Sequence, residues 1–225
     1  MKRQISIEEI SDGRLYKAND LVKAGCHDCI DCSLCCEGMG ESILLDPKDL
    51  YELTTYLGKS FEELLENNLE LHVVDGLILP NLKMHPEKDC CSFLDDNKRC
   101  SIHSVRPGFC RLFPLGRIYE QEDFHYFLQV HECPKEHKTK VKVKKWLGIE
   151  AISSYEEFIR SWHFIQKKTQ EIMEQKKDDS LTKKINLFVL QEFYVNPYTK
   201  EEDFYLQYAR REQKVLKLLE GIANS

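Results

Sequence analysis

The segment CHDCIDCSLCCE, residues 26–37, constrains this chain more than any other part of its sequence, because it places five cysteines within eleven residues. Its first four cysteines follow the spacing C-x-x-C-x-x-C-x-x-C, and Cys36 follows Cys35 directly. A C-x-x-C pair sets two sulfurs on one side of a tight turn, from which both can reach one metal. The adjacent Cys35 and Cys36 crowd any simple disulfide pairing. The segment therefore predicts thiolate ligands to a metal.

The composition of the chain favours the same chemistry. It has 225 residues, ten cysteines and a net charge of -6. The first residues contain no apolar core followed by a cleavage site, so we expect a cytoplasmic protein, in which thiols stay reduced or bind metal. No apolar run reaches the roughly 18 residues of a membrane span, and the acidic balance argues against a general nucleic-acid binder. We therefore expect neither membrane nor nucleic acid as a partner.

The distribution of the cysteines divides the chain. All ten lie between Cys26 and Cys133, and the last 92 residues contain none. This shift predicts a cysteine-rich metal-binding domain over residues 1–137 and a helical region over residues 138–225 that packs on it. The predicted fold class is α+β, in which short strands and helices carry the cysteines and a helical bundle follows.

Local signals predict several elements of the first region. Asp46 followed by proline is typical of a helix start, and Gly58 of its end, so we expect a helix over residues 47–57. Ser60 and Glu63 form a capping box before a second helix over residues 61–67. Asp75-Gly76 between two apolar runs predicts a β-hairpin over residues 69–84. Further strands are expected at residues 91–94, 100–103 and 124–130.

The remainder of the chain has helical periodicity. Residues 135–145 contain six lysines, which we interpret as a solvated connector rather than a binding patch. Apolar stripes then predict three helices. Capping boxes place the first start at Ser153–Glu156 and the third at Thr199–Glu202, while the second helix is expected over residues 181–194.

The identity of the metal depends on the ligand pattern. Thiolate-rich sites suit zinc, copper(I) and iron–sulfur clusters. Structural zinc fingers usually present two separated C-x-x-C pairs, whereas an unbroken run is closer to the cysteine run that wraps a [4Fe–4S] cluster. We therefore expect one [4Fe–4S] cluster or two, with zinc as the alternative. The isolated cysteines nearer the C-terminus could be ligands or small buried apolar residues.

A known family shares these motifs. Residues 29–36, CIDCSLCC, followed by CSFL at 91–94, CSIH at 100–103, RPGFCRLFP at 106–114 and HECP at 131–134, resemble the YkgJ-type cysteine-cluster proteins, described as zinc- or iron-chelating. The resemblance covers about residues 26–134. It implies eight ligand positions, and Cys26 of the opening run adds a ninth candidate. The predicted metal ligands are Cys26, Cys29, Cys32, Cys35, Cys36, Cys91, Cys100, Cys110 and Cys133.

Three functions follow as alternatives. The first is an iron–sulfur protein in electron transfer or cofactor-dependent modification, with a protein substrate or redox partner. The flagellin lysine N-methylases resemble the family in their cysteine region, which implies the second, S-adenosylmethionine-dependent methyl transfer to protein lysine. The third is a zinc-stabilised interaction module. Arg106 and Arg111 beside Cys110 are candidate binding residues for an anionic substrate or cofactor carboxylate, although they could simply balance thiolate charge.

Overall fold

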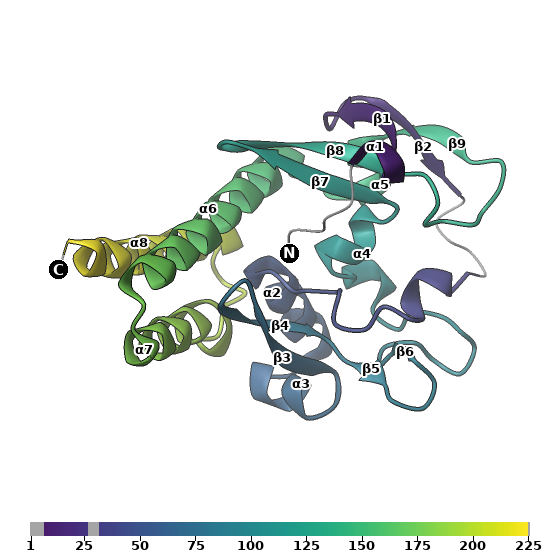
Figure 1. Cartoon of the computed structure of the whole chain (residues 1–225). Helices are drawn as coiled ribbons and strands as arrows, with labels where there is room; N and C mark the ends of the chain where they lie inside the picture. The colour runs from purple at the N-terminus through teal and green to yellow at the C-terminus, as the bar shows by residue number, and fades with distance from the viewer. Residues whose placement is uncertain (1–6, 27–31, 225) are drawn as a thin grey trace.

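The structure is a computed structural model that describes residues 7–26 and 32–224. Helices and strands alternate in the first two thirds of the chain, and long helices form the last third (Figure 1). The helices are α1 Ile7–Ile10, α2 Pro47–Leu57, α3 Phe61–Asn67, α4 Gly108–Leu112, α5 Val143–Leu147, α6 Ile152–Lys176, α7 Asp179–Leu190 and α8 Phe204–Ala223. Single turns lie at η2 Leu34–Cys36, η3 His103–Val105 and the π-helical η4 Gln191–Val195.

The strands form small antiparallel sheets. Strands β1, β8 and β7 form one sheet in that order, and the other three sheets are the pairs β2–β9, β3–β4 and β5–β6. Their bounds are β1 Ser11–Tyr16, β2 Leu21–Gly25, β3 Leu69–Val74, β4 Leu77–Leu82, β5 Met84–His85, β6 Cys90–Cys91, β7 Leu115–Glu120, β8 Asp123–Gln129 and β9 Thr139–Lys142. The predicted α+β class with a C-terminal helical region is confirmed.

The helix caps and the hairpin turn read from the sequence predicted their elements correctly. Asp46 caps α2 and Gly58 ends it in the left-handed conformation that favours glycine. Ser60 and Glu63 form the predicted capping box of α3. Strands β3 and β4 pair along their whole length around Asp75-Gly76, both of which have positive φ, as the hairpin prediction requires.

Several expected elements were wrong. The strands expected at residues 91–94 and 100–103 do not form. Cys91 is the last residue of the two-residue strand β6, and a single bridge joins Leu94 to Cys100. The lysine-rich segment is no connector, since it supplies β9, which pairs with β2, and α5. Helix α6 starts at Ile152, and its N-cap is Ala151, which makes no side-chain hydrogen bond, rather than the expected Ser153. Helix α8 is capped by Asp203 instead of Thr199.

The C-terminal helices share one core with the first region. Helix α6 lies against α8 (Figure 1). Aromatic rings pack between the tail elements, and the ring centroids of Trp162 and Phe193 are 5.0 Å apart. The Tyr194 hydroxyl donates to the backbone oxygen of Leu45, and Asn186 exchanges hydrogen bonds with the β3–β4 hairpin. The tail therefore packs on α2 and the hairpin. The described helices include none with the length and apolar character needed to cross a membrane.

Candidate metal centre

Six cysteines line one enclosed cavity, which we call the larger cysteine cavity. Its volume is about 70 Å³, several times the roughly 10–15 Å³ that one water molecule needs. Apolar side chains such as Met39, Ile43 and Phe113 complete its wall. The cysteines come from four separate segments of the chain and are Cys32, Cys35, Cys36, Cys91, Cys100 and Cys110.

A smaller cysteine cavity adjoins the larger one. Its volume is about 20 Å³, which is close to the space of a single water-sized particle. Four cysteines line it, Cys26, Cys32, Cys35 and Cys133. The two cavities share Cys32 and Cys35, so the eight lining cysteines separate into four that face only the larger cavity and four that face the smaller.

Local structure explains which sulfurs reach the cavities. Cys35 and Cys36 lie in the tight turn η2, whose backbone is closed by a bond from the Cys36 N–H to the Ser33 oxygen. Successive residues of a strand point to opposite faces. In β6, Cys91 is buried and lines the larger cavity, whereas its neighbour Cys90 lines neither cavity. Strand alternation therefore selects one of two adjacent cysteines.

The sulfurs of the larger cavity interact electrostatically. The Cys36 thiol donates a hydrogen bond to Cys35, which lowers the pKa of Cys35 to about 7 against the opposing effect of burial, with a further contribution from Arg106. The pKa of Cys36 is raised by the same bond and then by burial. Burial raises the pKa of Cys91 to about 11 and also raises the pKa values of Cys100 and Cys110.

These shifts show what the cavity needs. Burial and repulsion between neighbouring sulfurs oppose the simultaneous ionisation of several thiols. A bound metal cation would supply the positive charge that stabilises the thiolates. The donor set is soft sulfur in an apolar wall, which suits zinc or iron–sulfur ligation. As they stand, no three His, Cys, Asp or Glu side chains of the described segments converge closely enough to ligate a single ion. The sulfurs are spread around the cavity walls instead.

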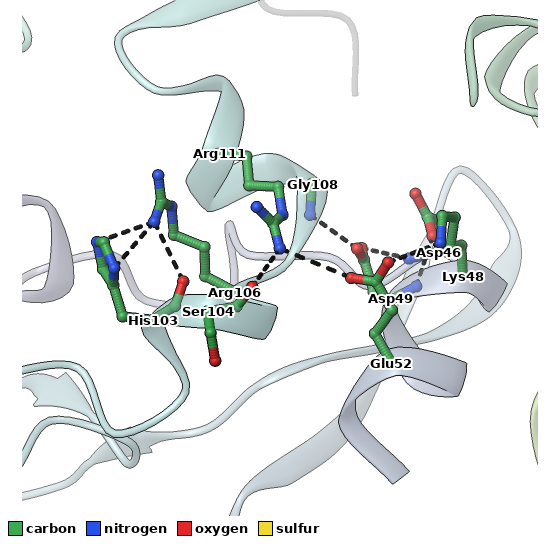
Figure 2. Close-up of polar contacts among 9 residues, drawn as sticks. All are labelled: Asp46, Lys48, Asp49, Glu52, His103, Ser104, Arg106, Gly108 and Arg111. Carbon is green, nitrogen blue, oxygen red and sulfur yellow. Dashed lines mark hydrogen bonds and ion pairs between the residues drawn. The ribbon is translucent and has the colours of Figure 1, made fainter. Parts of the chain in front are cut away.

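The other predicted site residues lie in different places. Cys29 falls outside the described residues. Arg106 lines the larger cysteine cavity and contacts both ring nitrogens of His103, at 3.0 and 2.9 Å (Figure 2). Arg111 does not reach that cavity; it donates to the Ser104 oxygen at 2.6 Å and pairs with Glu52.

Asp49 was not predicted as a site residue, but it positions one wall of the larger cavity. Its buried carboxylate accepts a hydrogen bond of 2.7 Å from the N–H of Gly108, the first residue of the short helix that carries Cys110 (Figure 2). It also accepts one from the Asp46 N–H in the capping box of α2. Burial, followed by the charge of Asp46, raises its pKa well above the ordinary value. The capping motif was visible in the sequence, whereas the link to Gly108 joins residues 59 positions apart.

Replacing Asp49 with alanine should destabilise the protein and loosen metal binding. The change leaves a buried Gly108 N–H without an acceptor and removes half of a capping box, which together cost about 2–4 kcal/mol. Chemical denaturation and metal content measure the two effects. Ser60→Ala is the matched control, since it breaks a capping box remote from the cysteines and should cost about 1 kcal/mol with metal retained. Equal metal loss in both variants would contradict this role for Asp49.

Gly108 itself should not tolerate a side chain. A Cβ atom there would meet the hydroxyl of Tyr155, which accepts a hydrogen bond from the half-buried Arg117. Gly108→Ala should therefore cost about 1–3 kcal/mol through overpacking. Gly221→Ala is the control, because a Cβ in that exposed part of α8 meets nothing and should stabilise the helix by about 1 kcal/mol. Thermal unfolding that moved both variants in the same direction would count against the close approach.

Trp146 is a second residue that the sequence did not indicate. It belongs to α5, donates to the Phe113 backbone oxygen at 3.1 Å, and lines both cysteine cavities. It also lines an open cleft of about 900 Å³ on their outer side. All residues that line the two cysteine cavities lie between Cys26 and Trp146. The site therefore draws on the first region, predicted to end at residue 137, and on α5 just beyond that boundary.

An α+β scaffold that brings eight cysteines from distant segments around two adjoining cavities defines a cysteine-cluster, metal-chelating protein. The sequence model of the family "CxxCxxCC: Putative zinc- or iron-chelating domain" matches residues 28–144. The chain belongs to this family, and the resemblance noted from its motifs is confirmed.

Comparison with individual proteins finds relatives that share part of the chain. "Uncharacterized protein MJ0661" of Methanocaldococcus jannaschii is 32% identical over 116 residues, which cover 49% of this chain and 59% of that protein. The matched part thus spans about three fifths of the relative's length. No solved structure matches the chain.

Proposed function

We propose that the larger cysteine cavity binds a [4Fe–4S] cluster and that the protein acts in electron transfer or cofactor-dependent modification. The observation that carries this proposal is that six cysteines from separate segments line one enclosed cavity. Four of them, Cys36, Cys91, Cys100 and Cys110, do not line the smaller cysteine cavity, and they match the four thiolates of such a cluster. When bound, the cluster would supply one-electron redox chemistry.

The wall of the cavity supports a redox cluster rather than a bare ion. Its volume exceeds what a single ion requires, and its apolar side chains limit solvent access, which is one determinant of cluster potential. Arg99 and Arg106 are the cations that line it, and each would offset the negative charge of a thiolate-bound cluster. A protein substrate or redox partner would approach from the side of the open cleft.

The test of this function is the visible spectrum of protein purified without oxygen. A cluster predicts broad sulfide-to-iron absorption at about 400 nm that decreases when the protein is reduced. A colourless protein that binds zinc would overturn the proposal and leave a zinc-stabilised interaction module.

The smaller cysteine cavity favours a second candidate in addition to the first, a mononuclear structural site. Its volume suits one ion, and Cys26, Cys32, Cys35 and Cys133 supply the four sulfurs of a closed tetrahedral zinc site. Cys133→Ala should then release one zinc while leaving the visible spectrum in place. Loss of the spectrum in this variant would instead place Cys133 on the cluster.

The open cleft beside the cavities favours one further candidate, methyl transfer from S-adenosylmethionine to a protein lysine. Its volume of about 900 Å³ lies within the roughly 300–1,000 Å³ of small-molecule sites. Arg106 and Arg111 line it and could hold the carboxylate of the methyl donor. Calorimetric titration of the cluster-containing protein with S-adenosylmethionine tests this candidate, and a titration without binding heat would remove it.

A further inference from the structure

The open cleft has a charge opposite to that of the whole chain. Four cationic side chains line it, Arg106, Arg111, Lys140 and Lys145, and no Asp or Glu of the described residues does. Glu52 offsets part of this charge through its pairing with Arg111 at 3.8 Å. A concave patch of one sign concentrates ions of the other. On a chain with a net charge of -6, such a patch needs an explanation.

Balance of thiolate charge does not explain the whole patch. Arg106 lines both the cleft and the larger cysteine cavity, so it can serve the sulfurs. Lys140 and Lys145 line the cleft but neither cysteine cavity, and both are exposed. These two lysines face whatever occupies the cleft rather than the metal centre.

Regular secondary structure holds both lysines at the cleft. Lys140 belongs to β9, which is fixed by pairing with β2, and Lys145 lies in α5 directly before Trp146. The two arginines also line the cleft. They are held by backbone oxygens, Arg106 by that of His103 at 3.1 Å and Arg111 by that of Ser104 (Figure 2). Preorganised cations of this kind bind carboxylate or phosphate groups with less loss of side-chain entropy.

We propose that this cleft is the binding site for a small organic anion that carries carboxylate or phosphate groups and lies directly against the metal centre. The volume of about 900 Å³ suits a small molecule. The contact with the metal centre follows from shared walls, since Trp146 lines the cleft and both cysteine cavities. The position beside a cluster rests on the proposed function, whereas the anion site itself does not.

The test is calorimetric titration of the full chain, purified without oxygen, with inorganic phosphate and with succinate. Sodium chloride at matched ionic strength measures non-specific screening. We expect saturable binding of one or both probes, and the tighter probe identifies the phosphate or the carboxylate class. The double variant Lys140→Gln/Lys145→Gln should weaken binding about tenfold, because it removes two of the four cations.

A matched control separates the site from general charge. Lys142→Gln/Lys144→Gln changes the same charge in the same segment at residues that do not line the cleft, and it should alter affinity by less than about twofold. Equal weakening in both double variants, or no saturable binding in protein that contains the cluster, would overturn the anion site. Iron and sulfide counted in the same samples keep the tests apart: anion binding by iron-free protein would uphold the site and reject the cluster.

Discussion

Replacing Cys91 with alanine should remove the iron–sulfur cluster, whereas replacing the adjacent Cys90 should leave it in place. Cys91 is buried and lines the larger cysteine cavity, while Cys90 lines neither cavity. Each vertex of the cluster needs a thiolate, so the loss of one of four exclusive ligands should release most of about four irons per chain. Iron content and absorption at about 400 nm measure the effect.

The two variants control for each other closely. Both remove one thiol from the same two-residue strand, and the residues differ chiefly in the face of β6 on which they lie. A general effect of cysteine loss on folding would therefore appear in both. Full iron retention in Cys91→Ala, or equal loss in Cys90→Ala, would show that the ligands have been assigned to the wrong sulfurs.

Removal of the metal should loosen the cysteine-rich region much more than the helical tail. Segments around the larger cavity, such as Leu34–Cys36 and Gly108–Leu112, are one turn long and depend on shared ligands. Metal binding of this kind is part of the folding free energy. Amide exchange in these segments should accelerate about a hundredfold or more in metal-free protein.

The tail supplies the internal comparison. Helices α6 and α8 pack through buried aromatic rings, among them Phe158 and Tyr208 with centroids 4.7 Å apart. This packing contains no cysteine, so exchange within α6 should change by less than about threefold. Mass spectrometry resolves the two regions in one experiment. Uniform acceleration along the chain would mean that the metal stabilises the fold as a single unit and would contradict a local role.

Elements that depend on neighbouring residues could be predicted from the sequence. The capping box of Ser60 and the turn at Asp75-Gly76 are local, because their hydrogen bonds and dihedral angles involve residues a few positions apart. Capping boxes are weaker evidence where nearby residues compete for the same role. Asp203 lies one position before the start of α8 and takes the cap that Glu202 and Thr199 were expected to form.

Features that depend on distant partners were missed for a physical reason. The lysines of residues 135–145 suggest a solvated segment, yet β9 within it pairs with β2. Val141 of β9 is partly buried, and Val143, the first residue of α5, is fully buried. The pairing partner lies more than a hundred residues away, and periodicity within a short window does not identify it. The strand expected around Cys100 was wrong for the same reason, because a single bridge to Leu94 replaces a ladder there.

The candidate site also combines features that depend on neighbouring residues with features that depend on distant ones. Cysteine spacing nominated the ligands of residues 26–36, and the resemblance to the family added those from Cys91 onward. The ligand set and the domain boundary at residue 137 stay predictions. The separation of the sulfurs into two cavities required the fold, since Cys36 and Cys110 come together only through the turn η2 and helix α4. The supporting roles of Asp49 and Trp146 likewise rest on contacts across the chain.

The central claim, that the larger cysteine cavity holds an iron–sulfur cluster, is tested most directly by counting iron, acid-labile sulfide and zinc in protein purified without oxygen. The account predicts about four irons and four sulfides per chain, with at most about one zinc in the smaller cavity. Zinc bound in the absence of both iron and sulfide would contradict it.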